Sequence, residues 1–112
     1  MNYGINEKYN CIVIKLNGKV MGGPDAKTFR NDLAKLIEEE KKNVVVDLSN
    51  VKFMNSSGLG ILIGGLKKMN EAGGDLKICG ATDRIKSLLM VSQLTKIFDT
   101  HETLDEALAA YK

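Results

Sequence analysis

The chain of 112 residues carries 16 basic and 14 acidic side chains, for a formal net charge of +2 at pH 7. Its length fits one domain over residues 1–112, and a hydrophobic fraction of 44% is enough for a continuous core without disulfides or metals. Basic and acidic residues are interleaved and only 5% of residues are aromatic. The sequence therefore lacks the basic, aromatic-lined stripe of a direct nucleic-acid binder.

The first part of the chain predicts two strands before any helix. Residues 3–9 are a candidate edge strand. Residues 11–16 are rich in Ile and Val and form a stronger candidate, which the turn residues Asn17 and Gly18 are expected to end.

A helix and a central strand follow. Pro24 suits the first helical position, and Asp25 complements the positive end of the helix dipole. Apolar residues then recur at helical spacing on one predicted buried stripe, formed by Ala26, Phe29, Leu33, Leu36 and Ile37. Residues 44–48 are almost continuously apolar, which is typical of a strand covered on both faces. A short separate segment, 51–54, comes after it.

The second half predicts a long helix over residues 57–72, stopped by Gly73 and Gly74. The apolar residues expected on its inner face are Leu59, Leu62, Ile63, Leu66 and Met69. Residues 75–79 predict a further strand. Thr82 and Asp83 begin a helix whose inner side is expected to carry Ile85, Leu88, Leu89 and Ser92.

The chain is predicted to end in a short strand at residues 97–98 and a terminal helix. Thr103 and Glu106 form a capping box that opens this helix. Its inward residues are expected to be Leu104, Ala107, Leu108 and Tyr111. The alternation of strands and helices predicts an α/β fold with a mostly parallel, four- to five-stranded sheet and right-handed crossover helices. Sites on such sheets lie at the carboxyl ends of strands.

One loop at such a strand end carries several polar groups. Asn55, Ser56 and Ser57 stand where the long helix begins, beside free backbone N–H groups that suit an anion such as phosphate. The simpler interpretation is that Asn55 or Ser56 is an N-cap. Glycines 58, 60, 64 and 65 follow, each costing up to about 1 kcal/mol relative to alanine in a helix. Either they pack against the sheet or a partner protein approaches this helix closely.

Other chemistry has little support in the sequence. There is no phosphate loop, no Rossmann fingerprint, and no Gly-x-Ser-x-Gly setting for Ser56 or Ser57. His101 is the only histidine, and a serine hydrolase would need it beside Ser56. We therefore expect no catalytic residues, no cofactor, no metal and no enzymatic activity.

Cys11 and Cys79 each lie in an apolar run, which predicts buried, reduced thiols rather than a disulfide or a zinc site. The N-terminus lacks the pattern of a signal peptide, and the longest apolar block, 59–66, is too short to span a bilayer. These observations predict a cytoplasmic monomer without membrane insertion.

Residues 44–60 read VVVDLSNVKFMNSSGLG, and this segment resembles the signature of the STAS domain. More narrowly it is similar to the stand-alone bacterial anti-sigma-factor antagonists, and the similarity extends over nearly the whole chain. The resemblance implies a single STAS-like domain at 1–112 that works by partner switching. In that family the unphosphorylated protein binds an anti-sigma factor that is also a serine kinase, which frees the sigma factor. The kinase then phosphorylates a loop serine and a phosphatase reverses the modification.

Carried over by position, the phosphorylated serine is Ser56, and Ser57, Gly58 and Leu59 match the rest of the loop. Asn55 replaces the family's acidic residue before the phosphoacceptor. The loop after the second strand, usually Gly-Glu-Leu-Asp or similar, here contains Lys19, Met21 and Gly22. The resemblance implies that these loop residues, with Asn55, Ser57, Gly58 and Leu59, contact the partner.

Two hypotheses follow. The first is an anti-sigma-factor antagonist controlled by phosphorylation of Ser56, with an anti-sigma factor kinase and a phosphatase as partners. The second is a protein-binding module of the same fold that is not phosphorylated and serves another signalling or membrane-associated complex. Asn55 and Lys19 favour the second.

Overall fold

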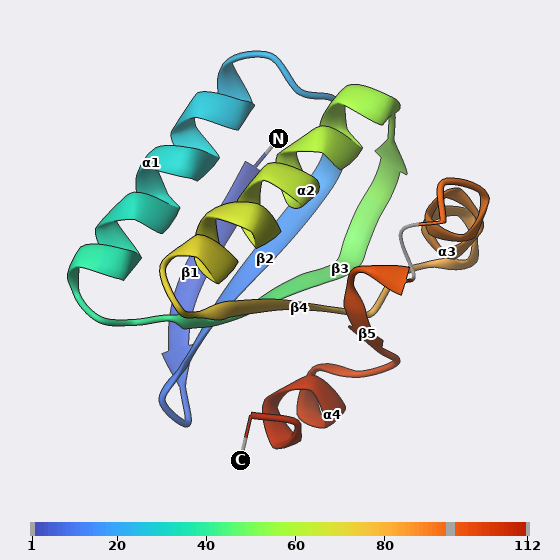
Figure 1. The fold of residues 1–112 in the computed structure, drawn as a ribbon. Helices are drawn as coiled ribbons and strands as arrows, with labels where there is room; N and C mark the ends of the chain where they lie inside the picture. The colour runs from blue at the N-terminus through green and yellow to red at the C-terminus, as the bar shows by residue number, and fades with distance from the viewer. Residues whose placement is uncertain (1, 94–95, 112) are drawn as a thin grey trace.

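A computed structural model describes residues 2–93 and 96–111 of the chain. Strands and helices alternate after an initial strand pair, in the order that the sequence predicts (Figure 1). The elements are β1 (Asn2–Lys8), β2 (Cys11–Val20), α1 (Pro24–Glu38), β3 (Asn43–Met54), α2 (Ser56–Glu71), β4 (Asp75–Cys79), α3 (Asp83–Val91), β5 (Asp99–His101) and α4 (Leu104–Ala109).

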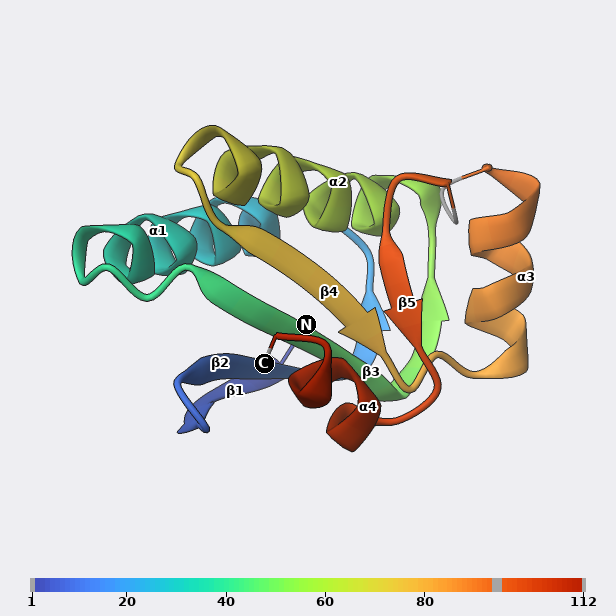
Figure 2. The same ribbon diagram turned by 60° about the horizontal axis from the view of Figure 1, so that its bottom comes forward.

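The strands form one sheet in the spatial order β1-β2-β3-β4-β5. Only the β1–β2 pair is antiparallel, and the other three pairs are parallel. Figure 2 shows α1 and α2 on one face of the sheet and the short α4 on the opposite face, while α3 stands at one end of the sheet. The predicted α/β fold with a mostly parallel sheet is confirmed.

The main core lies between the sheet and the α1–α2 layer. It takes inward residues from β2, β3 and β4 and the buried stripes of both helices, among them Phe29, Leu33, Leu62 and Met69. Pro24 is at the start of α1, as expected, and Phe29, Leu33 and Leu36 are its buried residues. Ala26 and Ile37 are only partly buried against this core.

Two predicted strand boundaries are wrong, the end of the second strand at Gly18 and the break between residues 48 and 51. β2 continues without a break to Val20, with Gly18 at a positive φ of 75°. Pairing with β3 is kept on both sides because the extra residues at the two register shifts lie on β3. Residues 44–48 and 51–54 are likewise one strand, β3, which pairs with β2 on both sides of the irregularity.

In α2 and α3, one residue each was wrongly predicted to face inward. Ile63 is exposed, and Ile61 is buried in its place. Gly58 and Gly65 occupy the inner face of α2, so a pattern read from apolar side chains alone misplaces that face. In α3, Ser92 is exposed, since the helix ends at Val91.

The last strand lies at Asp99–His101 rather than at residues 97–98. Phe98 is buried in the main core while Ile97 is exposed, so the apolar pair marks the approach to the strand. In α4 the Thr103 hydroxyl accepts a hydrogen bond from the Glu106 N–H at 3.2 Å, which confirms the Thr103 half of the predicted capping box. The reciprocal bond from the Thr103 N–H to the Glu106 carboxylate is absent among the described residues.

Candidate functional site

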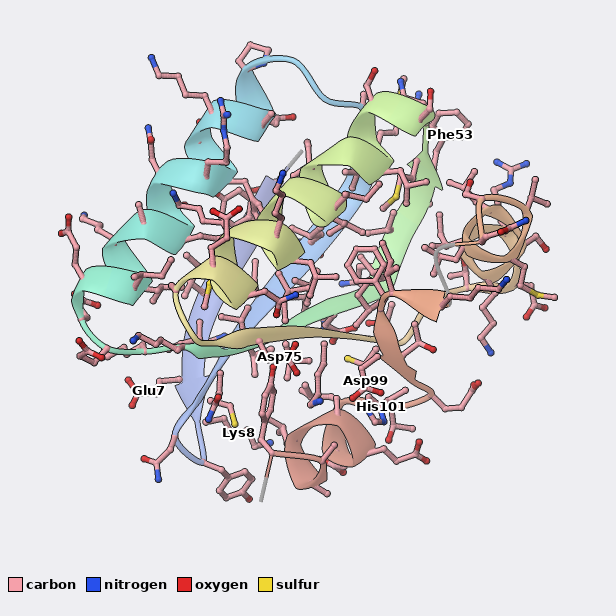
Figure 3. All side chains as sticks on the ribbon, viewed as in Figure 1. Glu7, Lys8, Phe53, Asp75, Asp99 and His101 are labelled. Carbon is pink, nitrogen blue, oxygen red and sulfur yellow. The ribbon has the colours of Figure 1, made fainter. Side chains whose placement is uncertain are left out.

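The polar loop connects the end of β3 to the start of α2. Phe53, near the end of β3, lies beside the first turn of α2 (Figure 3). Asn55 is the N-cap, since its Oδ1 accepts a hydrogen bond from the Gly58 N–H at 2.7 Å. The Asn55 N–H in turn donates to the Val20 carbonyl at 3.3 Å. Asn55 is therefore held between β2 and α2. Of the two predicted N-cap candidates, Asn55 and Ser56, Asn55 is the N-cap.

Ser56 and Ser57 follow the cap as the first two residues of α2, and both are exposed. Their hydroxyls make no hydrogen bond to any residue in the part of the chain that the structure describes. The first turn of α2 contains no acidic residue. The positive end of the helix dipole is thus not neutralised by a carboxylate of that turn.

The glycines of α2 fall into two groups. A Cβ on Gly58 would lie 1.8 Å from the Val20 carbonyl oxygen, and one on Gly65 would press against Phe29 and Leu33. Close packing inside the fold therefore explains these two. Gly60 and Gly64 have no heavy atom within 4 Å of the Cβ position. Internal packing does not explain their presence.

The loop after β2 meets the start of α2 from the side of α1. A Cβ on Gly22 would lie 2.7 Å from the Ser57 Cβ, so Gly22 is buried beneath that serine. Gly22 and Gly23 both have positive φ values, of 89° and 73°, which glycine adopts without strain. Two glycines in a row thus let the loop turn into α1 while touching α2.

Some of the residues that the resemblance implies as partner contacts are exposed, and others are buried. Lys19 and Met21 are exposed beside Ser56 and Ser57, which suits direct contact. Ser57 is also exposed and Asn55 is half-buried, while Gly22, Gly58 and Leu59 are buried. The role of the buried residues in this structure is to hold the loop in place from below.

One basic residue near the site was not predicted from the sequence. Arg30 of α1 is exposed and lines the same hollow as Ser57. No carboxylate pairs with it, nor with Lys19, within residues 2–93 and 96–111. Arg30 directly follows the buried Phe29, so its place at the edge of the helical stripe was the available signal.

A second polar cluster lies across the sheet from α1 and α2. The Lys77 ammonium binds the carboxylates of Asp75, at 3.2 Å, and Asp99, and it lies 4.7 Å from the centre of the Tyr111 ring. The hydrogen bond from Lys77 holds the pKa of Asp99 below its usual value. Figure 3 shows Asp75, Asp99 and His101 near α4. This cluster ties β4, β5 and the chain end together.

His101 belongs to this cluster, with its Nε2 3.3 Å from the Asp99 Oδ1. It lies on β5, away from Phe53 and the start of α2 (Figure 3). The geometry therefore gives Ser56 no histidine base, as a serine hydrolase would require. Among the described residues, no group of three or more His, Cys, Asp or Glu could hold a metal ion. In the same part of the chain no helix is long and apolar enough to cross a membrane.

Fold and site together define a class, an α/β domain with an exposed serine at the start of the helix after its longest strand. The model of the STAS domain family matches residues 3–107, so the chain belongs to the STAS family. The anti-sigma F factor antagonist of Paenibacillus polymyxa is 29% identical over 111 residues, which covers 96% of this chain and 94% of that protein. The anti-sigma-B factor antagonist of Staphylococcus aureus is 33% identical over 70 residues, or 62% of this chain and 65% of that protein.

Solved structures show the same fold at lower identity. A Thermotoga maritima protein described as an anti-sigma factor antagonist superposes with a TM-score of 0.86 and 17% identity, covering 96% of this chain and 92% of its own. The phosphorylated form of the Bacillus cell fate determinant SpoIIAA gives a TM-score of 0.74 and 17% identity, covering 99% of this chain and 100% of its own.

Proposed function

We propose that this chain is an anti-sigma-factor antagonist whose unphosphorylated form binds an anti-sigma factor and so releases a sigma factor. The names of the STAS relatives in Paenibacillus and Staphylococcus support this role. The observation that carries the proposal is the exposed Ser56 hydroxyl at the start of α2, without a hydrogen-bond partner among the described residues.

The switch in this proposal is phosphorylation of Ser56. The partner, acting as a kinase, transfers the γ-phosphoryl group of ATP to the Ser56 Oγ, with ADP leaving and the hydroxyl proton released, and a phosphatase hydrolyses the ester. The phosphoryl group adds about 1.5 to 2 negative charges. The helix N-terminus tolerates such a charge, at a gain of about 0.3–1 kcal/mol. In a close-packed interface an unpaired charge costs more than that, so the phosphorylated form releases its partner.

The site geometry favours Ser56 over Ser57 as the acceptor. Ser56 shares an outward stripe of α2 with Gly60 and Ile63, which follow it at spacings of four and three residues. Ser57 instead lies against Gly22 and lines the hollow beside α1. A kinase active site therefore reaches the Ser56 hydroxyl with fewer neighbours in the way.

Substitutions at the two serines test the proposal. Ser56→Ala should fold, bind the anti-sigma factor and resist the kinase. Ser56→Asp should fold but bind the same protein about ten- to a thousand-fold more weakly, because it places a charge in a close contact. Ser57→Ala is the matched control and should leave phosphorylation working. Calorimetric titration, with circular dichroism as a check on folding, measures these effects. Equal affinities of folded wild-type protein and Ser56→Asp would contradict the charge switch.

Asn55 favours a second candidate, a STAS-type binding module that is not phosphorylated. Its side chain caps α2, and an aspartate could accept the same bond from the Gly58 N–H. Asn55→Asp should therefore leave stability within about 0.5 kcal/mol of wild type. We expect it to change the phosphorylation rate of Ser56, measured by mass spectrometry with the purified kinase. Failure of the kinase to phosphorylate Ser56 in both proteins would instead support the unmodified module.

A further inference from the structure

A groove runs between the first turns of α1 and α2, directly beside the two serines. Its volume is about 260 Å³. The loop and α1 supply one wall, and α2 supplies the other. The lining residues are Gly22, Gly23, Ala26 and Arg30 on one side and Ser57, Gly60, Ile61 and Gly64 on the other. Every lining residue of α2 except Ile61 is a serine or a glycine.

The α2 wall is open to close approach from outside. A Cβ added at Gly60 or Gly64 would meet no described atom within 4 Å outside its chain neighbours and the adjacent helix backbone. Each glycine costs the isolated helix up to about 1 kcal/mol relative to alanine. Internal packing does not require their small size, and a partner that packs against the helix backbone would.

The groove has one basic side chain in its wall. Arg30 is exposed on α1 and lines the groove. No carboxylate of the described residues pairs with it. Asp25, in the first turn of α1, is half-buried and already has a partner.

α1 carries Asp25 in its first turn and Asp32, which accepts a hydrogen bond from the Tyr3 hydroxyl, in its middle. Residues 38–40 are three glutamates at and beyond the end of α1, where Lys41 and Lys42 pair with Glu39 and Glu40. The carboxylates of Asp32, Glu39 and Glu40 thus have partners elsewhere, and Arg30 is the charged residue among those that line the groove.

We propose that this groove binds an acidic segment of the anti-sigma factor, with a partner carboxylate on the Arg30 guanidinium. This inference rests on the proposed function and names the chemistry of its partner. Arginine binds a carboxylate through two parallel hydrogen bonds, which gives direction as well as charge. Ile61, which also lines the groove, supplies apolar contact. Arg30 is then a residue that determines which anti-sigma factor this chain accepts.

Charge reversal on α1 tests the proposal. The probes are the purified anti-sigma factor kinases encoded in the same genome, titrated by calorimetry against the wild-type chain, Arg30→Glu and Lys35→Glu. Lys35 is the matched control, because it is an exposed cation in the last turn of the same helix and does not line the groove. We expect Arg30→Glu to weaken binding at least about tenfold and Lys35→Glu less than about threefold. Replacing the paired partner carboxylate with arginine should restore binding to Arg30→Glu.

A second variant keeps the test independent of charge. Gly60→Gln fills the groove without meeting any described atom near its Cβ, so it should fold and should bind at least about tenfold more weakly. Raising salt from about 0.05 M to about 0.5 M should weaken the wild-type complex more than that of Arg30→Glu.

The outcomes distinguish a failure of the acidic-segment proposal from a failure of the proposed antagonist function. If the wild-type chain binds one of the kinases and Arg30→Glu binds it equally well, the acidic-segment proposal fails and the antagonist function stands. Equal weakening by Arg30→Glu and Lys35→Glu also rejects it, since the effect would then be one of net charge. If no anti-sigma factor binds the wild-type chain, the proposed function fails and this inference fails with it.

Discussion

The two faces of the sheet are built differently. The face under α1 and α2 is a continuous apolar core that includes Phe29, Leu62 and Met69. The face under α4 has a small apolar cluster, formed by Cys11, Val13, Val45, Cys79, Ala107 and Leu108, with Leu104 and Tyr111 against it. It also holds the two buried charged residues of the described chain, Asp47 and Lys77.

The first face positions the candidate site at the start of α2, and the second face holds the C-terminal helix α4 on the sheet. On the first face, helix and sheet backbones touch, so the start of α2 is held rigidly. On the second face, a helix of six residues is held by few apolar contacts and by polar groups. The Tyr111 hydroxyl donates to the Val44 carbonyl at 2.7 Å, and Asp47 accepts from the Ser49 N–H at 2.9 Å. We expect the first face to dominate stability and the second to depend on pH.

The largest effect should come from the backbone contact on the first face. Gly58→Ala places a Cβ 1.8 Å from the Val20 carbonyl oxygen, which the strand cannot avoid without moving. We expect a loss of about 4–5 kcal/mol in the free energy of unfolding, at the upper end for a single substitution. Gly60→Ala is the control and should gain up to about 1 kcal/mol, since its Cβ position is open. Urea denaturation measures both, and equal stabilities for the two variants would refute the contact.

The second prediction compares the truncation of one buried side chain to alanine on each face of the sheet. Phe29→Ala removes a fully buried ring from the main core and should cost about 3–4 kcal/mol. Leu108→Ala should cost only about 2 kcal/mol, because the short α4 can shift to fill part of the space. Thermal and urea unfolding of the pair would test this ranking. A larger loss for Leu108→Ala would show that α4 is as tightly packed as the opposite helices.

The third prediction concerns Lys77, whose side chain is 9% exposed, while those of Asp75 and Asp99 are 42% and 51% exposed. Lys77→Met keeps the volume and leaves two carboxylates that water can reach, so it should cost about 1–2 kcal/mol at neutral pH. The lowered pKa of Asp99 means that its ion pair stabilises the fold above the usual carboxyl range.

That contribution is lost as pH falls below about 4, through the lowered pKa of the folded state. The stability difference between wild type and Lys77→Met should therefore shrink under acid. Urea midpoints measured from neutral to acidic pH would show it, with Lys35→Met as an exposed-lysine control. A gap that stays constant with pH would indicate that only the packing of the Lys77 chain matters.

The smallest effect concerns the thiols of the second face. Burial, with the nearby Asp47 carboxylate, raises the pKa of Cys79 to about 12. Burial also raises the pKa of Cys11. The thiolate is the reactive form, so Cys79 should label with iodoacetamide only through opening of the fold. We expect Lys77→Met to speed its labelling modestly, and labelling of native Cys79 at the rate of a free thiol would contradict its burial.

Much of the fold could be predicted because local signals agree with it. Pro24 at a helix start, the polar run at residues 55–57 and the Thr103 cap each mark an element where the structure has one. Free, buried cysteines were also predicted and are confirmed for Cys11 and Cys79. Each of these features depends on residues close together in the chain.

The predictions are wrong where contacts between residues far apart in the sequence determine the local structure. Ile63 faces out because Gly58 and Gly65 take the inner face of α2, and that choice depends on Val20, Phe29 and Leu33. The strand expected to end at Gly18 continues because β3 pairs with β2 beyond the bulge. In the candidate site, the serine loop was predicted from its residue types. Arg30 was not, since only the packing of α1 against α2 brings it beside Ser57.

The contact between Gly58 and the Val20 carbonyl has a consequence for how such a domain could transmit a signal. Because residue 58 has no side chain, the first turn of α2 lies directly against the strand backbone, where a Cβ would be 1.8 Å from the Val20 oxygen. We therefore expect a phosphoryl group on Ser56 to change the surface of α2 and not the position of its first turn. In the proposed switch, the partner would then detect one modified side chain rather than a change of backbone shape.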